Sequence, residues 1–212
     1  MLGPFGWFHR YEVFVIAFLS VLCVALYALD RIPATGLFAI LAVSSVPYVY
    51  AAVLTPFASR GIYLQQEQMH RFVTQFYLGN YAVNDLGLVS FERSRPDIFV
   101  LDLFGLASPE AARHPNKEAS WMRSVVFRHH ADLAMIYPQW FNVPQEWTPI
   151  GQLCEHHAHG TVLGAPCVSF YSTNPLQTPA LASDFARFSA TLPPGSYAVP
   201  DAPESRRVLP TP

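Results

Sequence analysis

Residues 81–110 read YAVNDLGLVSFERSRPDIFVLDLFGLASPE, and this stretch decides the fold class. It holds two short apolar runs, 81–83 and 98–103, and each meets an acidic residue at or near its end, Asp85 and Asp102. A glycine follows each acid within three residues. Short apolar runs that end in a polar residue and a glycine turn are typical of the ligand-binding edge of an α/β sheet. The stretch therefore predicts the organising part of an α/β domain.

The residues on either side of this stretch extend the same pattern. Apolar residues at helical spacing predict an amphipathic helix before it, and Ser108 followed by Pro109 predicts a helix start after it. The expected helices cover 61–78, a short segment from 109, 117–129 and 175–192. The expected strands cover 81–84, 88–91, 98–103, 131–137, 150–154 and 167–171. Together these elements predict one small α/β domain with a mixed sheet.

The front of the chain is apolar and almost free of charge. Charged residues make up 13% of the chain, about half the usual share for a soluble domain, and none occurs in 13–29 or in 32–59. Two transmembrane helices are therefore expected, at 13–29 and 35–54, joined by a tight turn at 30–33. A cleaved signal peptide or two buried helices of a soluble protein would give the same pattern, and both alternatives stay open.

These observations predict a membrane-anchored α/β protein, with a two-helix transmembrane hairpin followed by the small α/β domain. The expected domains are an interfacial segment with the two transmembrane helices at 1–60, the α/β domain at 61–192 and a disordered Pro-rich tail at 193–212. The net charge is −2, and Lys117 is the single lysine of the sequence. This balance argues against a nucleic-acid partner, which needs clustered Lys and Arg.

Seven motifs, in this order, carry a resemblance to a known family. They are FGWFHRYE at 5–12, TPFASRGIYLQQEQMHRFV at 55–73, YAVNDLGLVSF at 81–91, VLDLFGLASPE at 100–110, ADLAMIY at 131–137, SFYSTNP at 169–175 and TLPPG at 191–195. This order resembles the C-terminal end of bacterial polytopic membrane glycosyltransferases of the GT-C type. The resemblance implies a multi-pass protein of the inner (plasma) membrane, with an extracytoplasmic C-terminal domain. It also implies membrane lipid, a polyprenyl-phosphate sugar and an upstream multi-span catalytic partner, with no cofactor.

The sequence departs from the GT-C pattern at the catalytic position. GT-C enzymes resemble one another in an acidic residue, often one of a pair, in the first extracytoplasmic loop, whereas no two acidic residues are adjacent in this chain. Asp30 falls in the turn between the two expected spans. No catalytic residue is therefore carried over, and the chain is interpreted as a fragment, a truncated reading frame or a split subunit. The first hypothesis is the C-terminal portion of such a glycosyltransferase, and the alternative is a non-catalytic membrane-anchored interaction or scaffold protein.

The candidate ligand-binding residues are Asn84, Asp85 and Asp102, at the ends of two expected strands. There they would contact a sugar or a polyprenyl phosphate. The alternative for Asp85 and Asp102 is structural, because a carboxylate before a glycine turn often accepts hydrogen bonds from nearby backbone N–H groups.

Further candidates lie near the end of the domain. Glu155 with the histidines at 156, 157 and 159 suggests a metal site, but the group lacks two ligand pairs at standard spacing, so a solvated loop is expected and no metal. Cys154 and Cys167 fall at the facing ends of two expected strands, where a disulfide is possible in an oxidising compartment.

Overall fold

The computed structural model describes residues 13–92, 95–156 and 163–200. The chain divides into two compact units, Met1–Arg60 and Gly61–Pro212. The division falls at the position where the apolar, charge-free part of the sequence ends.

The first unit consists of helical segments. Helix α1 covers Val13–Ala28, and α2 begins at Ala34 and runs to Leu64, into the second unit. Between them Asp30 has a φ of 54°, and the backbone N–H of Arg31 donates to the carbonyl of Leu26. This is the Schellman pattern that ends a helix with a left-handed residue.

One described helical segment, Ala34–Phe76, is long and apolar enough to cross a membrane. Its most apolar stretch of 18 residues has a mean hydropathy of 2.0, and none of these residues is buried. Helix α1 has 16 residues and falls short of the same length. The structure thus contains one candidate span by length and composition, where the sequence predicts two.

The amphipathic helix expected at 61–78 is divided into three parts. The last turn of α2 is followed by α3 at Gln66–Arg71 and by a π-helical segment, η1, at Phe72–Phe76. Gln65 separates α2 from α3 with non-helical dihedral angles, φ −122° and ψ −63°. The apolar face of α3 and η1 supplies Met69, Phe72 and Val73 to the core, as the helical spacing predicts.

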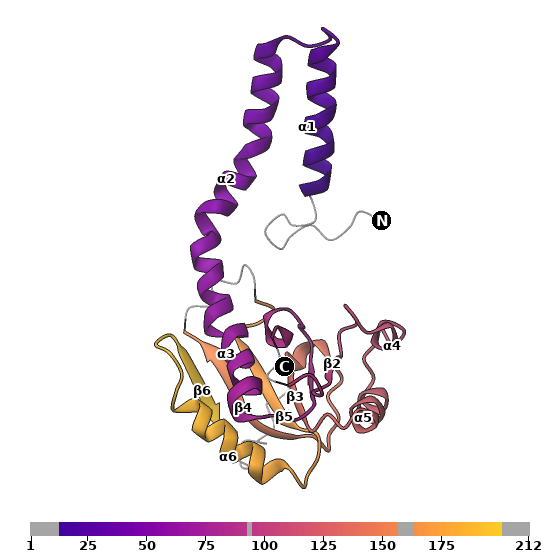
Figure 1. Ribbon diagram of the computed structural model, residues 1–212, viewed down its shortest axis with the longest axis vertical. Coiled ribbons are helices and arrows are strands. Elements are labelled where there is room, and N and C mark those ends of the chain that lie inside the picture. Colours follow the sequence, from indigo (N-terminus) through magenta and orange to yellow (C-terminus); the bar gives the residue numbers. More distant parts are fainter. Residues whose placement is uncertain (1–12, 93–94, 157–162, 201–212) are drawn as a thin grey trace, which may run out of the picture. The chain divides into compact units, whose positions relative to one another are not determined.

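The second unit is built on a six-stranded mixed sheet with the order β2-β1-β3-β5-β4-β6 (Figure 1). Strand β1 pairs with β2 and β3 in parallel, and the pairs β3–β5, β5–β4 and β4–β6 are antiparallel. The strands are β1 Tyr81–Val83, β2 Val100–Asp102, β3 Leu133–Ile136, β4 Thr148–Glu155, β5 Cys167–Ser172 and β6 Ser196–Pro200. The mixed sheet of the prediction is confirmed.

Two of the expected elements are wrong. Residues 88–91 were expected to form a strand, but Leu88–Ser90 is a turn of 3₁₀-helix, η2. The hydroxyl of Tyr81 donates to the carbonyl of Val89 at 3.1 Å, which holds this turn over the end of β1. The tail was expected to be disordered from 193, but Ser196–Pro200 forms β6, the outermost strand beside β4. Its backbone pairs with β4, a long-range partner that local composition does not reveal.

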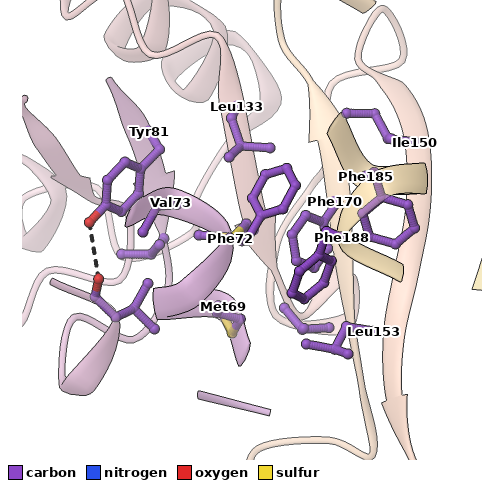
Figure 2. Close-up of a cluster of buried hydrophobic side chains, with 14 of the residues drawn as sticks. Met69, Phe72, Val73, Tyr81, Leu133, Ile150, Leu153, Phe170, Phe185 and Phe188 are labelled. Atoms are coloured by element: carbon purple, nitrogen blue, oxygen red, sulfur yellow. Dashed lines mark hydrogen bonds between the residues drawn. The ribbon is translucent and has the colours of Figure 1, made fainter. Parts of the chain in front are cut away.

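Helices cover both faces of the parallel strands. On one face, α3, η1 and α6 (Thr178–Ser189) pack over the sheet, and Phe72 lies 5.2 Å from Phe170 and 5.3 Å from Phe188 between ring centroids (Figure 2). On the other face, α5 (Ala119–Arg128) packs against Ala82, Leu101 and Ile136. The remaining short elements are α4 (Pro109–Ala112) and η3 (Pro138–Trp140).

Candidate functional site

The carboxyl ends of β1, β2 and β3 meet at one edge of the sheet. Val83 is in register with Asp102 on one side and with Met135 on the other. Asn84 therefore follows β1, and Tyr137 follows β3, at neighbouring positions of this edge. Because ligands bind outside the carboxyl ends of parallel strands, this edge is the place to examine for a site.

Asp102 is used by its own loop. Its carboxylate is buried, and it accepts four backbone N–H groups, from Phe104 (2.9 Å), Gly105 (2.9 Å), Ala107 (2.7 Å) and Ser108 (3.1 Å). A carboxylate offers about four acceptor positions, so these bonds occupy it. Asp102 therefore has the structural role that was the alternative to ligand binding: its carboxylate organises the turn that follows β2.

The loop after Asp102 also explains its glycine. Gly105 has a φ of 101°, and a Cβ at this position would lie 2.8 Å from the backbone nitrogen of Ala112. No side chain fits there without displacing the backbone of α4. The spacing of Asp102 and Gly105 is therefore a requirement of the turn.

Asn84 connects the ends of β1 and β3. Its side-chain oxygen accepts the backbone N–H of Tyr137 at 3.1 Å, and only 2% of the residue is exposed. Among the described residues, the Nδ2 of Asn84 has no hydrogen-bond partner. A buried amide with a free donor is rare, because each such group costs about 1–3 kcal/mol.

Two glutamines at the end of the apolar helix complete this arrangement. The hydroxyl of Tyr137 donates to Oε1 of Gln65 and accepts from Nε2 of Gln66 at 3.4 Å. The same Nε2 donates to Oδ2 of Asp85 at 3.3 Å. We call this group the edge cluster, and its members are Gln65, Gln66, Asn84, Asp85 and Tyr137.

The edge cluster contains a second polar atom without a partner. Oε1 of Gln66 has no hydrogen-bond partner within the described ranges, although the residue is only 4% exposed. Together with Nδ2 of Asn84, the cluster thus offers one acceptor and one donor that its own side chains do not use. Both atoms are buried, so they are polar groups of the interior at this end of the sheet.

Tyr137 stays protonated at neutral pH. Burial raises the pKa of its phenol well above the usual value, and the charges of Asp85 and Glu155 raise it further. The phenol therefore donates and accepts hydrogen bonds in the cluster and does not act as a base. The contacts that join the members of the cluster are hydrogen bonds.

Sequence analysis identified Asn84 and Asp85 but missed Gln65, Gln66 and Tyr137. The glutamines lie on the polar side of an amphipathic pattern, which normally faces water. Tyr137 ends an apolar run and is expected in the core. The sequence contains one indication of the glutamines: Gln65 and Gln66 directly follow the long apolar helix, at a position where a charged or aromatic residue is more usual.

The cysteine pair forms a disulfide between neighbouring strands. Cys154 in β4 faces Cys167 in β5, with a Cα–Cα distance of 4.1 Å. In the next pair along the two strands, Glu155 faces Pro166, and the backbone N–H of Glu155 donates to the carbonyl of Pro166 at 3.1 Å. The cysteines therefore occupy a non-hydrogen-bonded pair, in which antiparallel strands bring side chains closest.

The suggested metal ligands are not assembled in the described ranges. No group of three His, Cys, Asp or Glu side chains with metal-binding geometry occurs there. The ring of His156 stacks on Tyr197 at 4.4 Å, and Glu155 is buried. Positions 157 and 159 lie outside the described residues.

The fold and the edge cluster define a class of protein, an α/β domain that directly follows a long apolar helix. Residues 59–171, more than half of the chain, match the family described as a domain of unknown function, DUF8728. The chain belongs to this family. No curated protein and no solved structure matches the chain.

Proposed function

We propose that this chain is the C-terminal portion of an integral-membrane glycosyltransferase of the GT-C type, dependent on polyprenyl-phosphate sugars. In this proposal the α/β domain contributes a surface on the acceptor side, and the catalytic acid belongs to a partner with many spans. The edge cluster carries the proposal. It places polar side chains at the carboxyl end of the parallel strands, and two of its buried atoms, Nδ2 of Asn84 and Oε1 of Gln66, have no hydrogen-bond partner among the described residues.

The proposal includes a transmembrane hairpin of α1 and α2 in the inner (plasma) membrane. The apolar window of α2 supports one span, and the charge-free run at 13–29 supports the other. A signal sequence is the competing interpretation of an apolar helix near the N-terminus. The absence of charge from both runs favours the hairpin, because a second apolar segment follows the first after a turn of a few residues.

The proposal also places the α/β domain outside the cytoplasm. The disulfide between Cys154 and Cys167 supports this placement, because disulfides persist in oxidising compartments and are rare in the cytosol. Loop charge does not help, since Arg31 in the turn is balanced by Arg60 after the second run.

Thiol labelling in intact cells tests the placement. A Leu176→Cys variant, in a Cys23→Ser background that keeps the disulfide, exposes one reactive thiol, because Leu176 is 88% exposed. A reagent that does not cross the inner membrane should label this variant without lysis. Labelling that requires a broken inner membrane would put the domain in the cytoplasm.

An activity measurement tests the enzymatic part. The tagged chain is purified from its native membranes and, separately, from a host without related transferases. Both samples receive a radiolabelled polyprenyl-phosphate sugar and native membrane extract as acceptor. Donor-dependent transfer is expected from the native sample and none from the isolated chain.

Two results would contradict this proposal. Transfer by the isolated chain that is lost in Asp85→Asn would make the chain itself catalytic. No transfer by either sample would favour the alternative, a non-catalytic membrane-anchored interaction or scaffold protein. The occupied carboxylate of Asp102 favours that alternative, because it removes one of the two acids from the edge of the sheet.

A further inference from the structure

The loop at 103–108, between β2 and α4, presents apolar side chains to the outside of the domain. Its sequence is Leu-Phe-Gly-Leu-Ala-Ser, without a charge. Phe104 is 45% exposed and Leu106 is 67% exposed. Single exposed apolar residues are common, so exposure alone does not identify a contact surface. The hydrogen bonding and the position of this loop are what set it apart.

The backbone of the loop is satisfied from inside. Five of the six N–H groups at 103–108 donate within the domain, one to the carbonyl of Val83 at 2.8 Å and four to the carboxylate of Asp102. Leaving water costs a backbone group several kcal/mol if it has no partner. A loop with most of its N–H groups already bonded therefore enters an apolar environment at a low cost.

Three successive contacts connect this loop to the end of the apolar helix. The ring of Phe104 lies 5.7 Å from that of Trp140, and Trp140 lies 4.9 Å from Tyr137. The hydroxyl of Tyr137 donates to Gln65, the residue that follows α2 directly. The exposed ring of Phe104 is thus connected through Trp140 and Tyr137 to the helix end, at the same edge of the sheet.

The last turns of α2 have the composition of a membrane–water interface. Phe57 and Tyr63 are 59% and 53% exposed, and Arg60 lies between them. Aromatic residues and arginine concentrate at the headgroup level of a bilayer. From Arg60 to Gln65 the chain advances about 7.5 Å as a helix. If α2 crosses a membrane, chain connectivity alone keeps Gln65, and the edge of the sheet bonded to it, close to the headgroups.

We infer that the loop at 103–108, together with Trp140, inserts Phe104 and Leu106 into the headgroup region of the bilayer that α2 enters. This inference rests on the membrane-spanning part of the proposed function and not on glycosyl transfer. The occupant is the lipid surface, because the loop is apolar, uncharged and internally bonded, and because the chain enters the domain at the same edge.

Fluorescence quenching in vesicles tests this inference on the full chain. A Leu106→Cys variant in a Cys23→Ser background carries an environment-sensitive fluorophore, and the disulfide stays in place. The vesicles contain lipid with a spin label on the headgroup or near the ends of the acyl chains. We expect the probe to lose most of its fluorescence with the headgroup label and less with the chain-end label.

Leu176→Cys is the matched control. Leu176 is also an exposed leucine, but it follows β5, which runs antiparallel to β3, so it lies at the opposite edge of the sheet. Its probe should keep its fluorescence with both labels. Equal quenching at the two positions, or no quenching at 106, would overturn the inference.

Flotation of the same vesicles separates the two proposals. If the chain floats and only the probe at 106 is quenched, both the anchor and the inserted loop are supported. If the chain floats without quenching at 106, the anchor stands and the loop inference fails. If the chain does not float with the vesicles, the membrane-spanning part of the proposed function fails, and the loop inference with it.

Discussion

The parallel and antiparallel halves of the sheet differ in strand length and in what holds them together. The parallel strands β2, β1 and β3 have three, three and four residues, and helices cover both of their faces. The antiparallel strands β4, β5 and β6 have eight, six and five residues, and a disulfide joins the first two. The short parallel strands are followed directly by loops with polar and aromatic residues, among them Asn84, Phe104 and Tyr137.

This difference separates the two halves of one sheet by what lies at the strand ends. The edge cluster and the loop at 103–108 lie at the carboxyl ends of the parallel strands, the cluster mostly buried and the loop with Phe104 and Leu106 exposed. The antiparallel half contributes backbone hydrogen bonds, the disulfide and Phe170, which packs among the aromatic rings of the core. Four sets of substitutions test this division, ordered by the largest loss in the free energy of unfolding expected within each set.

The largest effect is expected at the strand that joins the halves. Phe170 in β5 is fully buried and contacts the rings of Phe72 and Phe185 at 5.2 and 5.0 Å. Phe170→Ala should lower the free energy of unfolding by about 4–5 kcal/mol, since it leaves a cavity among packed rings. Urea unfolding of the full chain in detergent measures this loss. Phe127→Ala, at an 80% exposed position, is the control and should change stability by less than about 0.5 kcal/mol.

The two acids of the parallel edge should differ strongly. Asp102→Ala leaves four backbone N–H groups without their acceptor, and a loss of about 3–4 kcal/mol is expected. Asp85→Ala removes a partly exposed side chain that accepts from Nε2 of Gln66 at 3.3 Å, and it should cost less, about 1 kcal/mol. The same urea titration compares them, and similar losses would show that Asp102 does not organise its loop alone.

In the antiparallel half, the paired substitution Cys154→Ser and Cys167→Ser removes the disulfide. The cysteines are 13 residues apart, and opening a loop of this size should cost about 3 kcal/mol. Unfolding of the variant and of the wild type is compared with and without a reductant. A reductant that destabilises the variant as much as the wild type would show that the bond contributes nothing.

The effect expected at the phenol of the edge cluster is smaller than that of the disulfide. Tyr137→Phe should cost about 1–2 kcal/mol at neutral pH, because Oε1 of Gln65 loses its donor inside the domain. Thermal unfolding of both proteins measures the difference. An unchanged midpoint would mean that Gln65 finds another donor.

The same variant should change the response to alkaline pH. Burial raises the pKa of Tyr137 in the folded state above the ordinary value of 10.0, so the folded chain holds the phenolic proton more tightly than the unfolded chain does. This contribution is complete below pH 10 and is lost as the pH rises further, by up to about 1.4 kcal/mol per pH unit. Tyr137→Phe should therefore lose less stability above pH 10 than the wild type, and equal slopes would contradict the buried position of the phenol.

Local pattern predicted the elements whose side chains follow a regular period. The helix expected at 117–129 is Ala119–Arg128, and the strands expected at 150–154 and 167–171 are Thr148–Glu155 and Cys167–Ser172. These segments have several residues in phase, and glycine, proline or histidine marks their ends. Strand β6 has no such signal, because only its pairing with β4 makes it a strand.

The candidate site was half predictable for a related reason. Asn84 and Asp85 follow directly from a strand that ends before a glycine, which is a local feature. Gln65, Gln66 and Tyr137 join them through contacts that span 19 to 72 residues of sequence. Such contacts depend on the packing of α3 against the sheet, and no periodicity in a single sequence contains that information.

The two outer strands of the sheet limit how the domain meets copies of itself. Strand β2 offers three residues on one border, and β6 offers five residues that end in Pro200 on the other. Exposed borders invite pairing between sheets of neighbouring molecules, and short borders with proline resist it. The five residues that close the sheet after Gly195 thus give this border a short strand that ends in proline, a form that resists pairing with another copy of the chain.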